Sequence, residues 1–332
     1  APMRAVAADA PPPDAPLPVV TDASLVAGFG HNCMLHPTGR VKCWGTNGDG
    51  QLGLGDTAAR GDGPGEMGDA LPTVDLGRGR TAIALAAGGT HTCALLDDHA
   101  VKCWGSATSG QLGLGDTVTR GDAPGEMGDA LAAVDLGPLD VVALRAGSYF
   151  TCATSSTGVA ACWGGNSEGQ LGIGSSATRG DGPGEMGGAI STAGFGPGRH
   201  VATLAVGEFH SCAILDDASL KCFGAGQRGQ LGLEDTSNRG DQPGEMGDAL
   251  PVVDLGSGRT AQLDGAHVEF HRGIQNPLGI KLGAAMTAEW LTGLLDALDP
   301  DRVPGRITLI HRMGAGQVAA GLPPLIDAVR RT

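Results

Sequence analysis

The sequence predicts a mainly β fold of four similar units, followed by a smaller segment that mixes strands and helices. Two observations carry this prediction. The tripeptide Gln-Leu-Gly recurs about every 60 residues, and all eight cysteines and 49 of the 58 glycines precede residue 259. A fixed period of this size is typical of stacked or radially arranged repeats, and the change in composition marks a domain boundary. The four copies of the tripeptide begin at Gln51, Gln111, Gln170 and Gln230.

Net charge also divides the chain near residue 259. Residues 1–258 carry 14 Lys and Arg against 29 Asp and Glu, whereas residues 259–332 carry 8 against 7. An acidic first part without basic clusters disfavours nucleic acid and anionic membranes, because both are bound through Lys and Arg. No apolar run approaches the roughly 20 residues that a membrane span needs. We therefore expect neither nucleic acid nor membrane among the partners.

Residues 1–22 have the composition of a stiff, extended linker. Six prolines fall within the first 20 residues, and no hydrophobic periodicity accompanies them. The chain begins at Ala1 and shows no apolar core of a signal peptide. We expect either that a leader was removed or that the sequence is a fragment.

Within residues 23–258, each unit contains short apolar strands separated by glycine-rich turns. A unit opens with Gly-x-x-His-x-Cys and an apolar strand, and a turn then leads to Lys-Cys-Trp-Gly. Gly-Gln-Leu-Gly-Leu-Gly-Asp and Arg-Gly-Asp-x-Pro-Gly-Glu-Met-Gly-Asp-Ala follow, and Val-Asp-Leu-Gly leads into the next unit. Short β-branched or alternating segments punctuated by glycine favour strands over helices.

The cysteines occur in four pairs, and the members of each pair are ten positions apart. In the second unit the midpoint is Asp98, inside a polar turn, so counting back along both strands places Cys93 opposite Cys103. Opposed residues on antiparallel strands have Cα atoms about 4.5–5.5 Å apart, which is within the range of a disulfide. Four cross-strand disulfides are therefore predicted, each contributing up to about 3 kcal/mol. The pairs are Cys33–Cys43, Cys93–Cys103, Cys152–Cys162 and Cys212–Cys222.

The cysteines have two other possible states. Structural zinc is disfavoured because it needs cysteines two to four residues apart, and the alternative that stays open is eight buried free thiols in a reducing compartment. Four disulfides would imply an oxidising location, namely the periplasm, the cell surface or the medium.

The repeats resemble the regulator-of-chromosome-condensation repeat family in its cysteine-containing bacterial form. In the second unit the matching segments are residues 89–96, 101–105 and 110–116, and the resemblance covers about residues 23–258. It implies a β-propeller with one four-stranded blade per repeat. The family usually closes a ring of seven blades, so four repeats imply an open or partial ring, with a closed four-bladed ring as the alternative. Since family members mostly make protein–protein contacts, the resemblance implies a non-catalytic scaffold with an unknown protein partner.

Two loop motifs of the repeat have both a structural and a functional interpretation. Arg-Gly-Asp occurs in all four units, and we favour a loop that needs glycine with positive φ and an Arg–Asp contact over cell adhesion. Acids such as Glu126 and Asp129 suggest weak calcium binding, but no loop carries several acids at alternating positions, so solvated loop acids are favoured. The Arg-Gly-Asp motifs begin at Arg60, Arg120, Arg179 and Arg239.

Two further series of repeat positions point to packing. Histidine lies two residues before the first cysteine in three units, and Phe150 takes that place in the third, which favours packing over ligand binding. The aromatic residue after the second cysteine is expected in the core between repeats. The series are His31, His91, Phe150 and His210, and Trp44, Trp104, Trp163 and Phe223.

From residue 259 the pattern changes to alternating strands and helices. Residues 277–283 and 306–312 read as short strands, residues 263–272 as an amphipathic stretch, and residues 287–298 and 316–331 as helices. This βαβα order is typical of a piece of a β/α barrel or of a doubly wound sheet. Lys281 and Arg312 lie where such strands end, which in a β/α barrel is the catalytic face, and both suit a phosphate or carboxylate.

Residues 259–332 also resemble class II 3-deoxy-D-arabino-heptulosonate 7-phosphate synthase. The matching segments are residues 259–270, 276–283, 304–310, 312–314 and 322–324. That family condenses phosphoenolpyruvate with erythrose 4-phosphate, the first step toward chorismate and the aromatic amino acids, with a divalent metal that is often manganese or cobalt. The resemblance implies that Arg259, Lys281 and Arg312 hold the phosphate and carboxylate of phosphoenolpyruvate.

The segment departs from that family at functional positions. Gly258 stands where the family has an acid, and the family's metal ligands and Cys-Asp-Pro-Met-His-Gly-Asn-Thr motif have no counterpart in this sequence. We therefore expect no catalytic residue, no metal site and no cofactor in the chain as it stands. Gly-Arg-Thr-Ala occurs at both 79–82 and 258–261, as the joining of two genes would leave, which suggests a chimera.

The two interpretations place the protein differently. The first is an extracytosolic interaction scaffold that carries an inactive synthase fragment. The alternative is a cytoplasmic synthase, active only when the missing barrel and metal ligands are supplied.

Overall fold

The computed structural model describes residues 25–255, 278–282 and 307–311. The chain divides into two compact units between Asp254 and Leu255, a few residues before the change in composition at residue 259. The expected linker over residues 1–22 lies outside the described residues. Nothing in the described part forms a helix long and apolar enough to cross a membrane.

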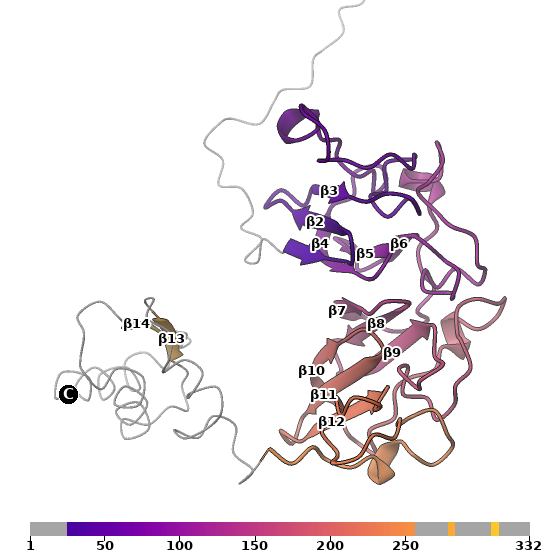
Figure 1. The fold of residues 1–332 in the computed structure, drawn as a ribbon, viewed down its shortest axis with the longest axis vertical. Coiled ribbons are helices and arrows are strands. Elements are labelled where there is room, and N and C mark those ends of the chain that lie inside the picture. The colour runs from indigo at the N-terminus through magenta and orange to yellow at the C-terminus, as the bar shows by residue number, and fades with distance from the viewer. Residues whose placement is uncertain (1–24, 256–277, 283–306, 312–332) are drawn as a thin grey trace, which may run out of the picture. The chain divides into compact units, whose positions relative to one another are not determined.

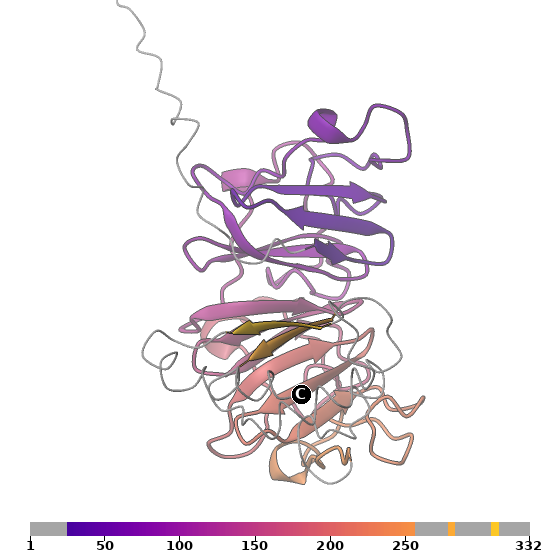
Figure 2. The ribbon, with the colours of Figure 1, turned by 90° about the vertical axis from the view of Figure 1, so that its left-hand side faces the viewer.

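Each repeat forms a three-stranded antiparallel sheet in which the strands lie side by side in chain order (Figures 1 and 2). The tight turn before the third strand needs a left-handed residue, which is Gly39, His99, Gly158 or Ala218, with φ between 65° and 77°. The strands are β1 (Leu25–Ala27), β2 (His31–Leu35), β3 (Val41–Gly45), β4 (Ala82–Ala87), β5 (His91–Leu96), β6 (Val101–Gly105), β7 (Val141–Ala146), β8 (Phe150–Ser155), β9 (Ala160–Gly164), β10 (Val201–Val206), β11 (His210–Leu215) and β12 (Leu220–Gly224).

The expectation of four regular strands per blade is wrong. The segment that would form the fourth strand is joined to the third by one backbone hydrogen bond, which in the first repeat runs from the Val74 N–H to the Val41 carbonyl at 2.9 Å. The ladder stops there because the segment turns to the following repeat, and the Asp75 carbonyl accepts the Gly128 N–H at 3.1 Å. A short 3₁₀ helix precedes each such segment: η1 (Gly68–Ala70), η2 (Gly128–Ala130), η3 (Gly187–Ala189) and η4 (Gly247–Ala249).

The hydrophobic core lies between successive repeats. One cluster joins Leu35 and Leu52 of the first repeat to Leu85 and Trp104 of the second, and similar clusters join the later pairs. The four sheets follow one another in chain order, and no backbone hydrogen bond between described residues joins the first to the fourth (Figure 1). The repeats therefore form an open arc, as expected, and the alternative of a closed four-bladed ring is wrong.

In the C-terminal unit, the structure describes two strands. Strands β13 (Leu278–Leu282) and β14 (Ile307–His311) pair in parallel, with Leu278 opposite Ile307 and Leu282 opposite His311. Both strands fall within the ranges predicted from the sequence, and parallel pairing is what a crossover connection requires. The predicted helices at 287–298 and 316–331, and the amphipathic stretch at 263–272, lie outside the described residues.

Candidate interaction surface

All four predicted disulfides are present. Each joins directly opposed residues of the second and third strands of a sheet, as in the Cys93–Cys103 pair, and no described cysteine is free. Both alternatives, zinc ligation and free thiols, are therefore wrong for these residues. Four disulfides in a chain of this size are typical of proteins outside the reducing cytosol.

A single backbone carbonyl organises the contact between the first two repeats. The Gln51 carbonyl accepts hydrogen bonds from the Thr92 hydroxyl at 2.9 Å and from the Trp104 indole N–H at 3.0 Å. Gln111 repeats both contacts with Thr151 and Trp163. At the third junction Phe223 has no N–H to donate, and only the Ser211 hydroxyl reaches the Gln170 carbonyl, at 3.2 Å.

The repeated histidine completes this network from the preceding sheet. His31 Nε2 lies 2.9 Å from the Thr92 oxygen, and His91 Nε2 lies 2.9 Å from the Thr151 oxygen. Because each threonine hydroxyl donates its proton to a glutamine carbonyl, the histidine Nε2–H is the donor to the hydroxyl oxygen. Burial lowers the pKa of His31 to about 4 and, with the added charge of His31 nearby, that of His91 to about 3.

The same rings explain the glycine that opens each repeat. A Cβ on Gly88 would lie within van der Waals overlap of the His91 ring, and one on Gly147 would overlap the Phe150 ring. The packing role that Phe150 predicts for the position two residues before the first cysteine is confirmed. The aromatic series after the second cysteine is buried at Trp104, Trp163 and Phe223, but Trp44 is only half-buried because no repeat precedes it.

The Arg-Gly-Asp loops hold successive repeats together. The Gly121 carbonyl accepts the Gly55 N–H of the preceding repeat at 3.0 Å, and Gly180 does the same for Gly115. Gly121 has φ of 89°, as the sequence suggested. In three of the four units the arginine pairs with the acid four residues earlier, as in Arg120–Asp116 at 2.8 Å, and not with the aspartate of its own motif. Three of the four motifs are thus inside junctions, which disfavours cell adhesion.

The loop acids have structural partners, contrary to the expectation that they are merely solvated. Glu126 accepts the backbone N–H groups of Gly121 and Ala123 at 2.9 and 3.0 Å. Asp129 accepts the Arg78 N–H of the preceding repeat at 2.9 Å, and that bond is the largest cause of its lowered pKa. Across the described residues no three His, Cys, Asp or Glu side chains gather as a metal site would need.

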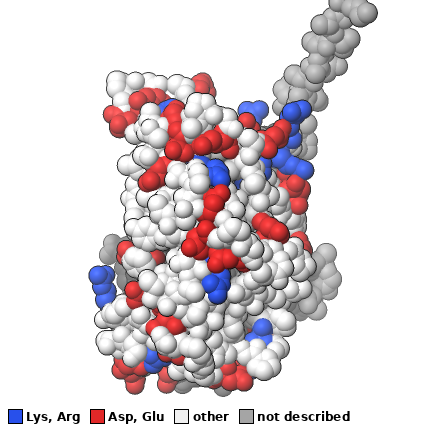
Figure 3. Space-filling view, turned by 90° about the vertical axis from the view of Figure 1, so that its right-hand side faces the viewer, with Lys and Arg blue, Asp and Glu red and all other residues white. Residues whose placement is uncertain are grey.

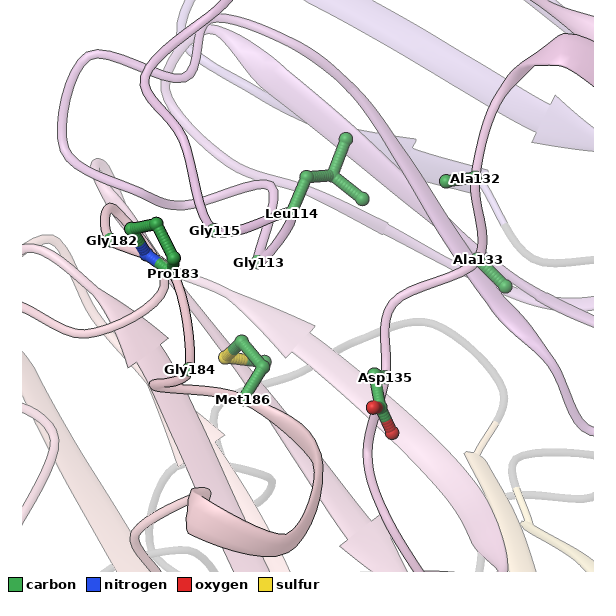
Figure 4. Close-up of a pocket in the computed structure, with 10 residues that line it drawn as sticks. All are labelled: Gly113, Leu114, Gly115, Ala132, Ala133, Asp135, Gly182, Pro183, Gly184 and Met186. Atoms are coloured by element: carbon green, nitrogen blue, oxygen red, sulfur yellow. The ribbon is translucent and has the colours of Figure 1, made fainter.

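A pocket of about 310 Å³ lies where the second repeat meets the third (Figure 4). Glycines line much of it, together with Leu114, Pro183 and Met186. Asp135 is the one ionisable lining residue, and its carboxylate already accepts the Gly137 N–H at 3.0 Å. A site without a second acid, base or nucleophile is poorly suited to catalysis.

Three aromatic residues lie along the turns that precede the second strands: Phe29 and Tyr149 are exposed, and Phe209 is half-buried. The turns are joined by backbone hydrogen bonds from Phe29 to Gly89, from Gly89 to Ser148 and from Ser148 to Glu208, at 3.1–3.3 Å. Beside them, the Tyr149 and Phe209 rings stack with centroids 6.0 Å apart, and the side chain of Phe29 is 65% exposed. We call Phe29, Tyr149 and Phe209 the aromatic strip.

Sequence reasoning missed the aromatic strip. Aligning the repeats on their opening glycine does not reveal it, because Phe29 follows that glycine by one residue, Tyr149 and Phe209 follow theirs by two, and the second repeat has no aromatic residue at either position. The surface of the repeats is otherwise rich in acids, and Figure 3 shows Asp and Glu spread over one face with fewer Lys and Arg.

Of the three residues expected at a phosphoenolpyruvate site, the structure describes only Lys281. Lys281 lies in β13, opposite Ile310 of β14. Arg259 and Arg312 lie outside the described residues, so their expected role stays a prediction.

Each of the two parts of the chain matches a known protein family. The Regulator of chromosome condensation (RCC1) repeat matches residues 23–51, 82–111, 141–170 and 201–230, and a second description of this repeat matches residues 38–95. The Class-II DAHP synthetase family matches residues 253–332. The chain therefore carries four RCC1 repeats and a C-terminal segment similar to class-II DAHP synthetase.

Individual relatives match one part each. The probable phospho-2-dehydro-3-deoxyheptonate aldolase of Catharanthus roseus is 57% identical over 72 residues, which are 22% of this chain and 15% of that protein. The chain thus spans about a seventh of that relative. The crystal structure of human WBSCR16 aligns with a TM-score of 0.50 and 20% identity, covering 72% of this chain and 54% of that one. Prp20p from Saccharomyces cerevisiae, whose structure is described with its binding to Gsp1p and histones, aligns with a TM-score of 0.47 and 20% identity. The alignment covers 64% of this chain and 45% of that one.

Proposed function

We propose that this protein is a non-catalytic interaction scaffold that works outside the cytosol and binds a partner protein through the aromatic strip. The observation that carries the proposal is the exposure of Phe29 and Tyr149 on turns that backbone hydrogen bonds link in series, with Phe209 stacked on Tyr149. Aromatic side chains dominate the energetics of protein interfaces. Other aromatic side chains of the same repeats are fully buried in the core, whereas Phe29 and Tyr149 remain exposed. The buried residues are Trp104, Trp163, Phe150 and Phe223.

The scaffold beneath the strip is suited to a rigid interface. Backbone hydrogen bonds link the turns that carry Phe29, Tyr149 and Phe209, and a disulfide closes the hairpin beside each turn. A preordered surface loses little conformational entropy on binding. The disulfides also suit an oxidising compartment. RCC1-like propellers such as Prp20p bind protein partners, which favours the same kind of function here.

The negative charge of the repeats favours a partner with basic residues. Residues 1–258 carry a net charge of −15, and acids are prominent on one face of the repeats (Figure 3). Complementary potentials accelerate association and reject partners of like charge. The partner segment therefore combines apolar side chains, which contact the strip, with lysine or arginine around them.

Peptide selection on the immobilised protein tests this function. We expect selected peptides to combine apolar and basic residues, and Phe29→Ser or Tyr149→Ser to weaken the best binder at least about tenfold, which corresponds to about 1.4 kcal/mol. Val118→Ser, at a residue 56% exposed in a loop, is the matched control and should bind as the wild type does. Equal binding by all variants would rule out the strip.

A second function is favoured by one observation, the 57% identity to a phospho-2-dehydro-3-deoxyheptonate aldolase over 72 residues. On this proposal the C-terminal segment binds phosphoenolpyruvate, with Arg259, Lys281 and Arg312 as the cations that hold its phosphate and carboxylate. The described residues offer no cluster that fits the manganese or cobalt of a complete synthase, so no catalytic step is assigned to the metal.

Calorimetry on the full chain tests this second function. Phosphoenolpyruvate should bind without added metal, and both Lys281→Ala and Arg312→Ala should abolish the heat signal. Arg199→Ala, which removes a cation paired with Asp217 in the repeats, should leave binding unchanged. Unchanged binding in the first two variants would remove the site.

A further inference from the structure

The arc ends in two sheet faces, one at each end, that no other described repeat covers. We call them the leading edge, formed by Leu25, Trp44 and Gly61 of the first repeat, and the trailing edge, formed by Ile214, Gln230 and Glu234 of the fourth. Inside the arc, every face of this kind is covered by the neighbouring repeat. The two edges can therefore be compared, position by position, with the junctions that the arc already contains.

Apolar side chains that are buried inside the arc are exposed at both edges. Leu25 is 65% exposed, whereas Leu85 at the same position of the second repeat is 5% exposed and packs on the first repeat. Ile214 is 40% exposed, whereas Leu95 at the same position is 1% exposed and packs on the third repeat. Each edge therefore exposes apolar surface that a neighbouring repeat would remove from water.

Hydrogen-bonding groups at the edges are complementary as well. At the first two junctions a tryptophan indole N–H donates to a glutamine carbonyl, and a loop N–H donates to the carbonyl of an Arg-Gly-Asp glycine. Among the described residues, the Trp44 indole and the Gly61 carbonyl at the leading edge have no such partner. At the trailing edge, the same holds for the Gln230 carbonyl and the Glu234 N–H.

The backbone at the trailing edge keeps the conformation of a junction. Glu234 has φ of 60°, close to the 72° of Gly55 and 74° of Gly115, although glutamate rarely adopts this region. The backbone at this position therefore stays in the left-handed region that the equivalent glycines occupy inside the arc. Gly229, whose counterpart Gly50 contacts the loop of the next repeat, has open space beside it.

We infer that the trailing edge of one copy of this protein docks on the leading edge of a second copy, through the contacts that join successive repeats. The occupant is a second copy because the two edges are the two halves of one junction and every chain carries both. Such a contact is heterologous, so it closes into a ring of copies or extends into a chain of them. Exposed apolar surface otherwise promotes uncontrolled association.

Light scattering coupled to gel filtration tests this inference on the full chain. At concentrations on the order of 100 µM, which would populate a complex of micromolar Kd, the mass should be twice the 33.1 kDa of one chain or a higher multiple. Leu25→Arg blocks the leading edge and Ile214→Arg the trailing edge, so each variant alone should run at 33.1 kDa. Val118→Arg is the control and should keep the wild-type mass.

Mixing the two edge variants is the discriminating step. The Leu25→Arg copy keeps an intact trailing edge and the Ile214→Arg copy an intact leading edge, so the mixture should recover a complex of two chains, which also shows that both are folded. A monomeric wild type, an unchanged mass in either variant alone, or a mixture that stays monomeric would each overturn the inference. A contact between two identical edges would be abolished by only one of the variants.

Discussion

Replacing His91 by phenylalanine should make the repeats less sensitive to acid. His91 is buried and donates to the Thr151 hydroxyl, and burial holds its pKa at about 3 against 6.5 for an exposed histidine. The folded protein therefore excludes a proton that the unfolded chain takes up below pH 6.5. Stability falls as the pH drops from 6.5 toward 3, by about 1.4 kcal/mol per pH unit for this one group.

The expected magnitude follows from that slope. Between pH 6.5 and pH 4, His91 should account for a loss on the order of 3 kcal/mol, which His91→Phe removes. The variant has a precedent, because Phe150 occupies the equivalent position and packs on Gly147 as His91 packs on Gly88. At pH 7.5 it loses one hydrogen bond, worth about 1 kcal/mol, but it also removes the His91 Nδ1, which is buried without a partner.

Urea unfolding followed by tryptophan fluorescence measures this effect, because Trp104 and Trp163 are fully buried. The free energy of unfolding is measured at several pH values between 7.5 and 4 for the wild type and for His91→Phe. His36→Phe is the matched control, since His36 is exposed in the first repeat, and it should keep the wild-type slope. Equal slopes for the wild type and His91→Phe would refute the role of burial.

Three further predictions concern the repeats. Reduction should raise the intact mass by eight hydrogens, two for each of the four disulfides, and an unchanged mass would contradict them. Trp104→Phe should cost about 1 kcal/mol of unfolding free energy through its lost hydrogen bond to Gln51, whereas Trp44→Phe, at a half-buried indole, should cost less; equal costs would contradict the junction network. Lys102→Met should cost about 2 kcal/mol, because the buried ammonium donates to the carbonyls of Leu76 and Gly128 at 3.1 and 2.7 Å. An unchanged denaturation midpoint for that variant would show that water satisfies both carbonyls.

Local sequence rules were sufficient for the disulfides and the paired strands. Side chains alternate along a strand and opposed residues meet around a turn, so the position of Asp98 alone places Cys93 against Cys103. The short apolar run that ends at Leu282 has the length and composition of a buried strand, and the structure contains it.

Contacts between residues about 60 positions apart could not be predicted in this way. The Thr92 hydroxyl meets Gln51 and His31 only because two sheets dock face to face, and no local pattern encodes that docking. Likewise, the segment around Val74 has the alternation of a strand, but its carbonyl groups contact the next repeat, so the ladder stops after one bond. The aromatic strip was missed because its members are isolated in sequence.

The central claim is that the function of this chain lies in binding by its repeats and not in catalysis. The most direct test mixes the purified full chain with phosphoenolpyruvate, erythrose 4-phosphate and manganese, and follows the absorbance of phosphoenolpyruvate. We predict no loss of absorbance above a reaction without protein. A loss at a rate proportional to protein concentration, abolished by Lys281→Ala, would contradict the claim and make the C-terminal segment an active synthase.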